Sequence, residues 1–237
     1  MPEVTFNGVA GRIEGRYHHT GQKGAPIALI LHSRSYPHCK GTMDNKVVYT
    51  LHHSFATLGF NTLRFNFRGV SRSEGTYDGG EGELKDAASA LDWLQARNTA
   101  ASSCWIGGFS FGAWIGMQLL MRRPELEGFI SVSLPANQYG FEFLAPCPVP
   151  GLILQGDKDE IVPPASVVKL VDKLQLQRGL QIDYRRVPMA DHFFTGKVTE
   201  LRSQVTDYLS RNVLRNAIPS PSSQAAGYPA PGVMWAV

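Results

Sequence analysis

Gly108-Phe109-Ser110-Phe111-Gly112 is the stretch from which the fold of this chain can be deduced, because Gly-x-Ser-x-Gly is the pattern of a nucleophile elbow. The apolar run Cys104-Trp105-Ile106 before it predicts a buried strand, and the apolar residues 111–121 after it predict a helix. The serine therefore lies at a strand-to-helix turn, where glycines on both sides leave room for neighbouring backbone. Such a turn exposes the hydroxyl at the carboxyl end of a sheet, so Ser110 is a candidate nucleophile.

A nucleophilic serine needs a base that accepts its proton and a carboxylate that orients the base. His192 is the only histidine that follows Ser110 in the chain, which makes it the candidate base if the order is serine, acid, histidine. Between them, the strand-like run 151–155 ends in a turn that contains Asp157 and Asp159, and Asp191 directly precedes His192. The residues alone leave the acid open among these aspartates.

These motifs resemble the α/β-hydrolase superfamily and, within it, small dienelactone-hydrolase-like serine hydrolases of unassigned substrate. The resemblance spans about residues 4 to 213 and rests on the elbow, Ile30-Leu31-His32, residues 41–46, Phe65-Asn66-Phe67-Arg68-Gly69, Gly156-x-x-Asp159-x-x-Val162-Pro163 and Asp191-His192-Phe193-Phe194. It implies a triad of Ser110, His192 and Asp159, with Asp157 as the second choice for the acid. Dienelactone hydrolases carry cysteine at the nucleophile position, so the serine argues against that narrow activity.

The resemblance also implies an oxyanion hole built from two backbone N–H groups. One is expected from Phe111, at the start of its helix, and the other from Arg34, in the loop after the strand that ends at His32. Relatives commonly read His-Pro-His-Pro followed by Gly-Gly in this loop, whereas this chain reads His32-Ser33-Arg34-Ser35-Tyr36-Pro37-His38-Cys39-Lys40-Gly41. His32 is expected to hold the loop in place.

The rest of the chain predicts alternating strands and helices, hence a mainly parallel sheet covered by helices on both faces. An opening hairpin is expected from Val4–Phe6 and Arg12–His18, turned at Asn7-Gly8. The later strands are expected at 27–32, 62–67, 104–107, 128–133, 151–155 and 181–187. The helices are expected at 46–58, 82–95, 111–121, 165–174 and 198–214.

Length and composition predict one α/β-hydrolase domain, residues 1–215, followed by a disordered Pro/Ser/Ala/Gly-rich tail, residues 216–237. The net charge of +3 is small and dispersed, which argues against a nucleic-acid partner. Three widely separated cysteines fit neither a disulfide framework nor a metal site, and the N-terminus lacks an apolar signal core. We therefore expect a cytoplasmic protein without membrane segment, metal or cofactor, and leave a homodimer open.

Substrate preference is expected to depend on what covers the site. The segment between the strands ending near 133 and starting near 151 is too short for a large helical lid, so the site should be open. Aromatic and basic residues are candidates for lining it, namely Arg34, Tyr36, Tyr139, Phe141, Phe143 and Phe193. This arrangement favours a serine hydrolase acting on small acyl or aryl esters. The alternatives are a thioesterase, lactonase or peptidase with the same triad, or a weakly catalytic binding protein on this fold.

Overall fold

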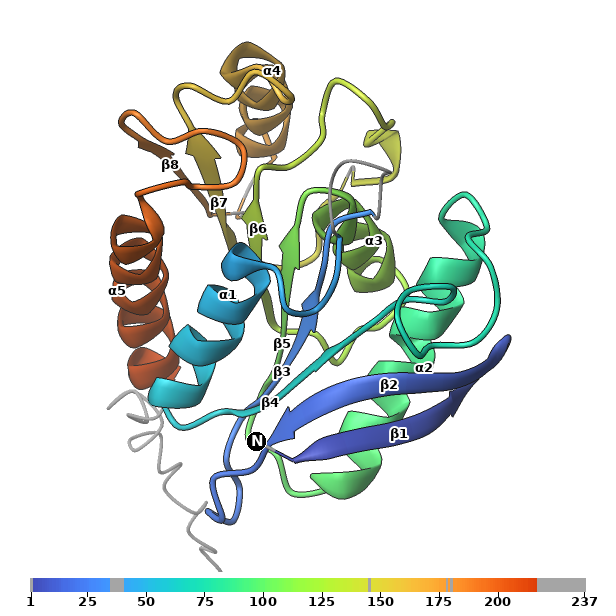
Figure 1. The fold of residues 1–237 in the computed structure, drawn as a ribbon. Helices are drawn as coiled ribbons and strands as arrows, with labels where there is room; N and C mark the ends of the chain where they lie inside the picture. Colours follow the sequence, from blue (N-terminus) through green and yellow to red (C-terminus); the bar gives the residue numbers. More distant parts are fainter. Residues whose placement is uncertain (1, 35–40, 145, 178, 180, 217–237) are drawn as a thin grey trace, which may run out of the picture.

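The computed structural model describes residues 2–34, 41–144, 146–177, 179 and 181–216, with side chains as far as Val213. The described residues form an eight-stranded sheet in the order β1-β2-β4-β3-β5-β6-β7-β8 (Figure 1). The strands β3 to β8 run parallel, and β2 is antiparallel to both β1 and β4. The strands are β1 (Glu3–Gly8), β2 (Gly11–His18), β3 (Ile27–Leu31), β4 (Asn61–Phe65), β5 (Cys104–Phe109), β6 (Gly128–Val132), β7 (Gly151–Gly156) and β8 (Ile182–Val187).

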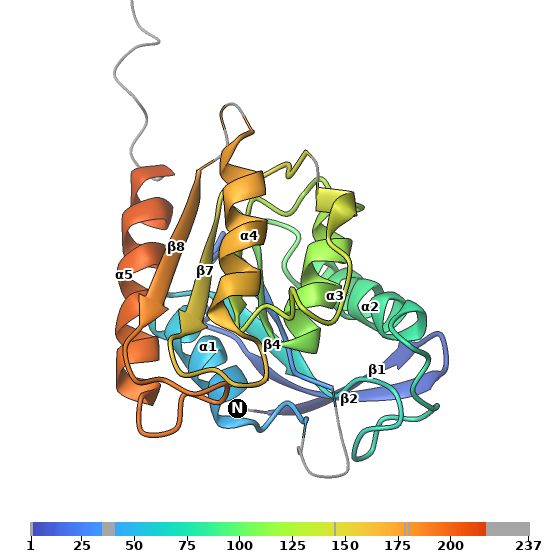
Figure 2. The same cartoon turned by 90° about the horizontal axis from the view of Figure 1, so that it is seen from above.

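Helices cover both faces of the sheet, as the alternation of the sequence predicts. Two of them, α1 and α5, pack on one face, and α2, α3 and α4 pack on the other (Figure 2). Every residue of β3 to β7 is buried, which explains why β3, β5, β6 and β7 are mostly apolar. The helices are α1 (Lys46–Thr57), α2 (Glu81–Arg97), α3 (Phe111–Leu120), α4 (Pro164–Gln175) and α5 (Val198–Asn216).

The opening hairpin is present, but its predicted turn at Asn7-Gly8 is wrong. Asn7 is still paired with Arg12, and Gly8 with Gly11, so the turn lies at residues 9 and 10. Gly11 has a φ of 124°, a conformation that glycine adopts without strain. The residue that adopts the positive φ at the end of this turn is therefore Gly11, and not a residue of the Asn7-Gly8 pair.

Between β6 and β7 the described residues form only one short 3-10 helix, η1 (Glu142–Leu144), in addition to loop. No helical lid formed by the described residues therefore covers the carboxyl ends of the parallel strands, where the elbow lies. Within the described residues, no helix is both long and apolar enough to cross a membrane. The predicted tail, from residue 217 onward, lies outside the described residues.

A buried ion pair joins the segment after β4 to α2. Arg68 donates from Nε (2.9 Å) and Nη2 (2.7 Å) to the Asp86 carboxylate, and its backbone N–H donates to the same group at 3.0 Å. The side chains are 8% and 0% exposed. Removing one member of such a pair leaves an uncompensated buried charge.

We therefore expect Asp86→Ala to lower the free energy of unfolding by about 3 to 5 kcal/mol, measured by urea denaturation. Asp92→Ala provides a matched control on the same helix, because Asp92 is 64% exposed in its ion pair with Arg123. Its loss should cost no more than about 1 kcal/mol. Equal losses in the two variants would contradict the prediction.

Candidate active site

Ser110 occupies a strained turn between β5 and α3. Its backbone has φ 51° and ψ −119°, and its N–H donates to the Val132 carbonyl of β6 at 2.9 Å. A Cβ at Gly108 would lie 2.5 Å from the Ala113 Cα, and one at Gly112 would lie 2.5 Å from the His32 carbonyl oxygen. Both glycines of the motif are therefore required by close backbone contacts, and the second one brings α3 against the end of β3.

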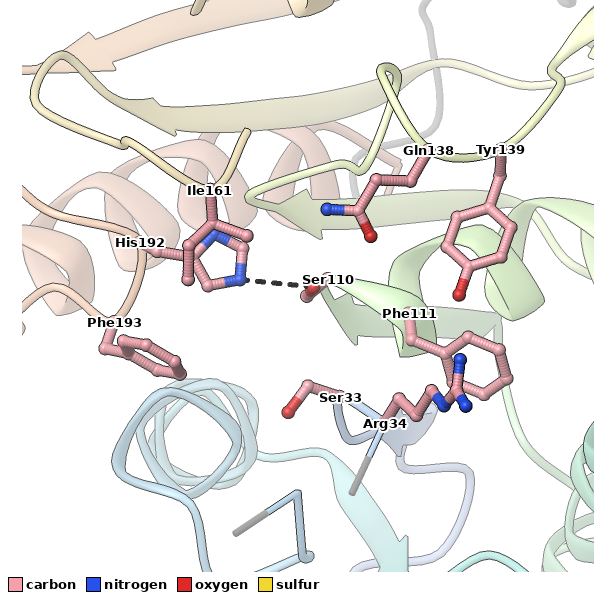
Figure 3. Close-up of a pocket in the computed structure, with 9 residues that line it drawn as sticks. All are labelled: Ser33, Arg34, Ser110, Phe111, Gln138, Tyr139, Ile161, His192 and Phe193. Carbon is pink, nitrogen blue, oxygen red and sulfur yellow. Dashed lines mark hydrogen bonds between the residues drawn. The ribbon is translucent and has the colours of Figure 1, made fainter. Parts of the chain in front are cut away.

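The structure brings Ser110, His192 and Asp159 into one hydrogen-bonded chain. His192 Nε2 lies 3.2 Å from Ser110 Oγ (Figure 3), and His192 Nδ1 lies 2.9 Å from Asp159 Oδ2. Both the histidine and the aspartate are buried, at 5% and 4% exposure. A carboxylate that accepts from Nδ1–H leaves Nε2 unprotonated and facing the serine, as a general base requires.

Asp159 is held by donors on all sides. Gln155 Nε2 donates to Oδ2 at 2.9 Å, and the backbone N–H groups of Ile161 and Val162 donate to Oδ1 at 3.0 and 2.7 Å. The Gln155 side chain donates a second time, to the Val162 carbonyl at 2.9 Å. These contacts fix the carboxylate in the orientation that meets the imidazole.

The two other candidate acids shape the histidine loop instead. Asp157 Oδ1 accepts from the Met189 N–H at 2.6 Å. Asp191 Oδ1 accepts from the backbone N–H groups of Phe193 (3.1 Å) and Thr195 (2.7 Å). Of the three aspartates, Asp159 is the one that contacts the imidazole.

Two further residues that the sequence did not suggest, Gln155 and Ser133, support this arrangement. Ser133 follows β6 directly, is fully buried and donates from Oγ to the His192 carbonyl at 3.0 Å. A Cβ at Gly156 would overlap the Ala190 carbonyl, so the end of β7 and the histidine loop are in direct backbone contact. The signal that could have identified both residues is their position at the carboxyl ends of the strands that follow the elbow strand.

His32 connects the loop after β3 to the end of β4. Its Nε2 accepts from the Phe67 N–H at 2.9 Å, so the other nitrogen, Nδ1, carries the proton and donates to the Ser33 carbonyl at 2.6 Å. Because a trans peptide directs its C=O and N–H to opposite sides, this bond also sets the direction of the Arg34 N–H. A Cβ at Gly41 would overlap the carbonyls of Ser33 and Arg34, so the two ends of the loop are packed together.

An open cavity of about 640 Å³ lies in front of Ser110 (Figure 3). Of the residues suggested by the sequence, Arg34, Phe111, Tyr139 and Phe193 line it together with Ser110 and His192. Three further residues line the cavity that the sequence did not suggest, namely Ser33, Gln138 and Ile161. The Arg34 guanidinium lies 4.2 Å from the centre of the Tyr77 ring.

Phe141 and Phe143 were expected at this cavity, and that expectation is wrong. Phe141 is 8% exposed and faces a second cavity, beside α4. Phe143 is half-buried, and its ring lies 5.8 Å from that of Phe141. The aromatic run 139–143 therefore divides, since Tyr139 lines the cavity at Ser110 and Phe141 lines only the second one. Tyr36 lies outside the described residues.

The described residues contain no group of three histidine, cysteine, aspartate or glutamate side chains placed to hold a metal ion. What the arrangement can do chemically is activate the Ser110 hydroxyl beside a cavity open to solvent. The backbone N–H of Phe111 is at the start of α3, where the helix dipole favours negative charge. The role of Phe111 and Arg34 as oxyanion donors stays a prediction.

Two buried histidines should make the fold sensitive to mild acid. Burial lowers the pKa of His32 to about 4 and that of His52, on α1, to about 3. The unfolded chain takes up these protons near pH 6.5, so the stability present above pH 6.5 is lost as the pH falls toward these values. From pH 6.5 to 5 we expect a loss of about 2 kcal/mol per histidine, above the range where carboxylates titrate.

Urea unfolding at pH 7 and pH 5 measures this loss. His52→Asn should remove a large part of the pH dependence, because one of the two imidazoles whose pKa burial lowers most is then absent. A free energy of unfolding equal at the two pH values in the unmodified protein would contradict the prediction.

Comparison with known proteins agrees with this geometry. The family model of X-Pro dipeptidyl-peptidases (S15 family) matches residues 20–141, and that of the prolyl oligopeptidase family matches residues 127–213. The uncharacterized protein RP471 of Rickettsia prowazekii (strain Madrid E) is 51% identical over 213 residues, which span 88% of this chain and 89% of that protein.

Two solved structures are similar over nearly the whole chain. The protein of unknown function ATU1826 from Agrobacterium tumefaciens is 55% identical and superposes with a TM-score of 0.87. The aligned region covers 93% of this chain and 100% of that one. XC6422 from Xanthomonas campestris, described as an α/β serine hydrolase without a lid, is 29% identical, with a TM-score of 0.78 over 92% and 95% of the two chains.

Proposed function

The chain belongs to the α/β-hydrolase superfamily of serine hydrolases, and from this we propose that it cleaves carboxylic esters with small acyl or aryl groups. The observation that carries the proposal is the hydrogen-bonded chain Asp159–His192–Ser110, which ends at a cavity with aromatic walls and no lid. An open cavity of this kind suits compact substrates better than long-chain triglycerides.

In the proposed mechanism, His192 Nε2 accepts the proton of Ser110 Oγ as the oxygen attacks the ester carbonyl. Asp159 stabilises the imidazolium that forms, and His192 then gives the proton to the departing alcohol oxygen. Water, deprotonated by the same imidazole, attacks the acyl-enzyme and releases the acid. The hydrogen bond from Gln155 keeps Asp159 aligned through both halves of the cycle.

In this mechanism the backbone N–H groups of Phe111 and Arg34 donate hydrogen bonds to the negative oxygen of the tetrahedral intermediate. Fixed dipoles of this kind stabilise the charge that develops without rearranging during the reaction, and one such donor contributes about 2.7 to 4 kcal/mol. His32 contributes indirectly, since its bond to the Ser33 carbonyl orients the Arg34 N–H.

The peptidase family models make cleavage of X-Pro peptides the second candidate function. A dipeptidyl-peptidase has to bind the N-terminal ammonium of its substrate, and a carboxylate is the usual partner for that charge. The described residues that line the cavity include no aspartate or glutamate, whereas Arg34 brings a positive charge. This charge favours neutral or acidic esters over peptides with a free N-terminus.

Thioesters and lactones would use the same residues, and a binding protein would retain the fold with little turnover. A fluorophosphonate separates these groups of activities, because it labels an activated serine whatever the natural acyl group. Labelling with ester turnover supports the proposal. Labelling without ester turnover points to thioesters, lactones or peptides, and no labelling favours the binding protein.

We expect hydrolysis of neutral p-nitrophenyl esters to be fastest for short acyl groups and to decline steadily from acetate and butyrate to palmitate. The reason is that a cavity open to solvent covers little of a long chain, so added methylene groups gain little transfer energy. The measurement is kcat/KM across the ester series. Alanyl-proline p-nitroanilide is measured beside it as a substrate for X-Pro dipeptidyl-peptidase activity. Rates that rise toward palmitate would refute the preference for small acyl groups, and faster anilide cleavage would favour the peptidase.

A further inference from the structure

A second cavity, of about 470 Å³, lies beside the one at Ser110. It is formed between residues 136–144 and one side of α4. Of the described residues, Tyr139 is the one that lines both cavities, and it is therefore their shared wall.

The interior of the second cavity is apolar. Phe141 and Leu144 line it from the loop side, and Leu170 and Leu174 line it from α4. Leu144 and Leu174 are 1% and 3% exposed, so they form a floor that belongs to the protein core. A methylene chain placed here would be removed from water on one side, so each CH₂ group would gain less than the roughly 0.8 kcal/mol of full burial.

Charged groups lie around this apolar floor. Lys169 and Lys173 line the cavity from α4, where a spacing of four residues places them on the same side of the helix. Both are exposed, and no described residue forms an ion pair with either of them. Glu142 lines the cavity from the opposite side, so the three groups together carry a net charge of +1.

Tyr139 is held against α3. Its ring is stacked on that of Trp114, with centroids 4.2 Å apart and planes 20° apart, and it lies 5.9 Å from the Phe111 ring. The Trp114 Nε1–H donates to the neighbouring Gly140 carbonyl at 3.3 Å, which fixes the chain at this point. The tyrosine ring is thus packed against α3.

We propose that the second cavity binds the distal part of the acyl group of acidic esters, namely an apolar arm that ends in a carboxylate. The arm extends from Ser110 past Tyr139, its methylene groups lie on the leucine floor, and its carboxylate meets Lys169 and Lys173. The inference rests on the proposed esterase function and extends it. At equal chain length, an acyl group that ends in a carboxylate is preferred to one that ends in a methyl group.

The net charge of the cavity favours a carboxylate over a phosphate as the terminal group. Two ammonium groups and the Glu142 carboxylate match one negative charge, whereas a phosphate carries nearly two at neutral pH and would be repelled by Glu142. The preferred substrates are therefore half-esters of dicarboxylic acids with intermediate chain length.

The test compares p-nitrophenyl octanoate with mono-p-nitrophenyl suberate, whose acyl groups have equal chain length and differ in the terminal group. We expect the suberate to be hydrolysed with roughly five- to tenfold higher kcat/KM, the range that two solvent-exposed charge pairs supply. In the double variant Lys169→Gln/Lys173→Gln the ratio should fall to about one. High salt should lower the ratio in the unmodified protein, because exposed charges are screened.

The matched control is Lys23→Gln/Lys85→Gln, which removes the same net charge from residues that do not line either cavity. It should keep the preference for the suberate. A ratio of one or less in the unmodified protein, or a ratio that survives in Lys169→Gln/Lys173→Gln, overturns the proposal. Loss of the preference in Arg34→Gln alone also overturns it, since the carboxylate would then bind in the first cavity.

A calorimetric titration separates failure of this inference from failure of the esterase proposal. Monomethyl suberate should bind to Ser110→Ala and should bind measurably more weakly when the two lysines are replaced as well. If neither ester is turned over but this binding pattern is found, the esterase proposal fails and the second site stands. If the esters are turned over but binding does not depend on the lysines, the esterase stands and the second site fails.

Discussion

Replacing Ser110 by alanine should lower ester hydrolysis by at least about 10⁴-fold and abolish labelling by a fluorophosphonate. The Oγ that lies 3.2 Å from His192 Nε2 is the only atom removed, and it is the proposed nucleophile. The fold should persist, because the backbone bond from Ser110 N to the Val132 carbonyl does not involve the side chain. Circular dichroism and the midpoint of thermal unfolding check this.

Ser33→Ala is the matched control, because Ser33 lines the same cavity and His32 contacts its carbonyl rather than its hydroxyl. It should retain most of the labelling and turnover. His192→Ala should behave like Ser110→Ala, since the serine then has no base. Activity retained in either of these two variants, with contaminating esterases removed, would show that another residue is the nucleophile or base.

Asp159→Asn should reduce kcat by about 10⁴-fold while the protein stays folded. The asparagine Oδ1 can still accept from the Ile161 and Val162 N–H groups, so its amide NH₂ replaces Oδ2. This NH₂ faces both His192 Nδ1 and the Gln155 amide, whose hydrogen bond to Oδ2 is lost. A donor at that position forces the imidazole proton onto Nε2, where it blocks proton transfer from Ser110. The measurement is kcat across the pH range, together with the rate of fluorophosphonate labelling.

Asp157→Asn and Asp191→Asn make the same chemical change nearby and serve as controls. Asp157 accepts from the Met189 N–H, and Asp191 accepts from the N–H groups of Phe193 and Thr195; an asparagine oxygen can do the same. Each change should therefore cost less than about tenfold in kcat. A larger loss in either control than in Asp159→Asn would move the role of the acid to that residue.

The strands and helices could be predicted from the sequence within a few residues, because each depends on a local pattern. The buried strands are short apolar runs, and the helices between them have the length and periodicity of covering elements. The turn of the first hairpin was misplaced because register depends on the partner strand, and the Asn7–Arg12 pair continues beyond the apparent turn signal. The assignment to the α/β-hydrolase superfamily is confirmed by the comparisons with known proteins. It was possible from the sequence because its motifs are short local patterns at the strand ends.

The sequence by itself determined the order of the triad candidates, since one histidine follows Ser110 and every carboxylate in question lies between them. The resemblance implied Asp159, but only the tertiary structure shows which of the three aspartates contacts the imidazole, because all three lie on two adjacent loops. The same holds for Phe141, which lines the second cavity rather than the one at Ser110, and for Ser133 and Gln155, which support the site. Which side chains meet is decided by how the ends of parallel strands pack together, and residues far apart in the chain carry no local signal of that contact.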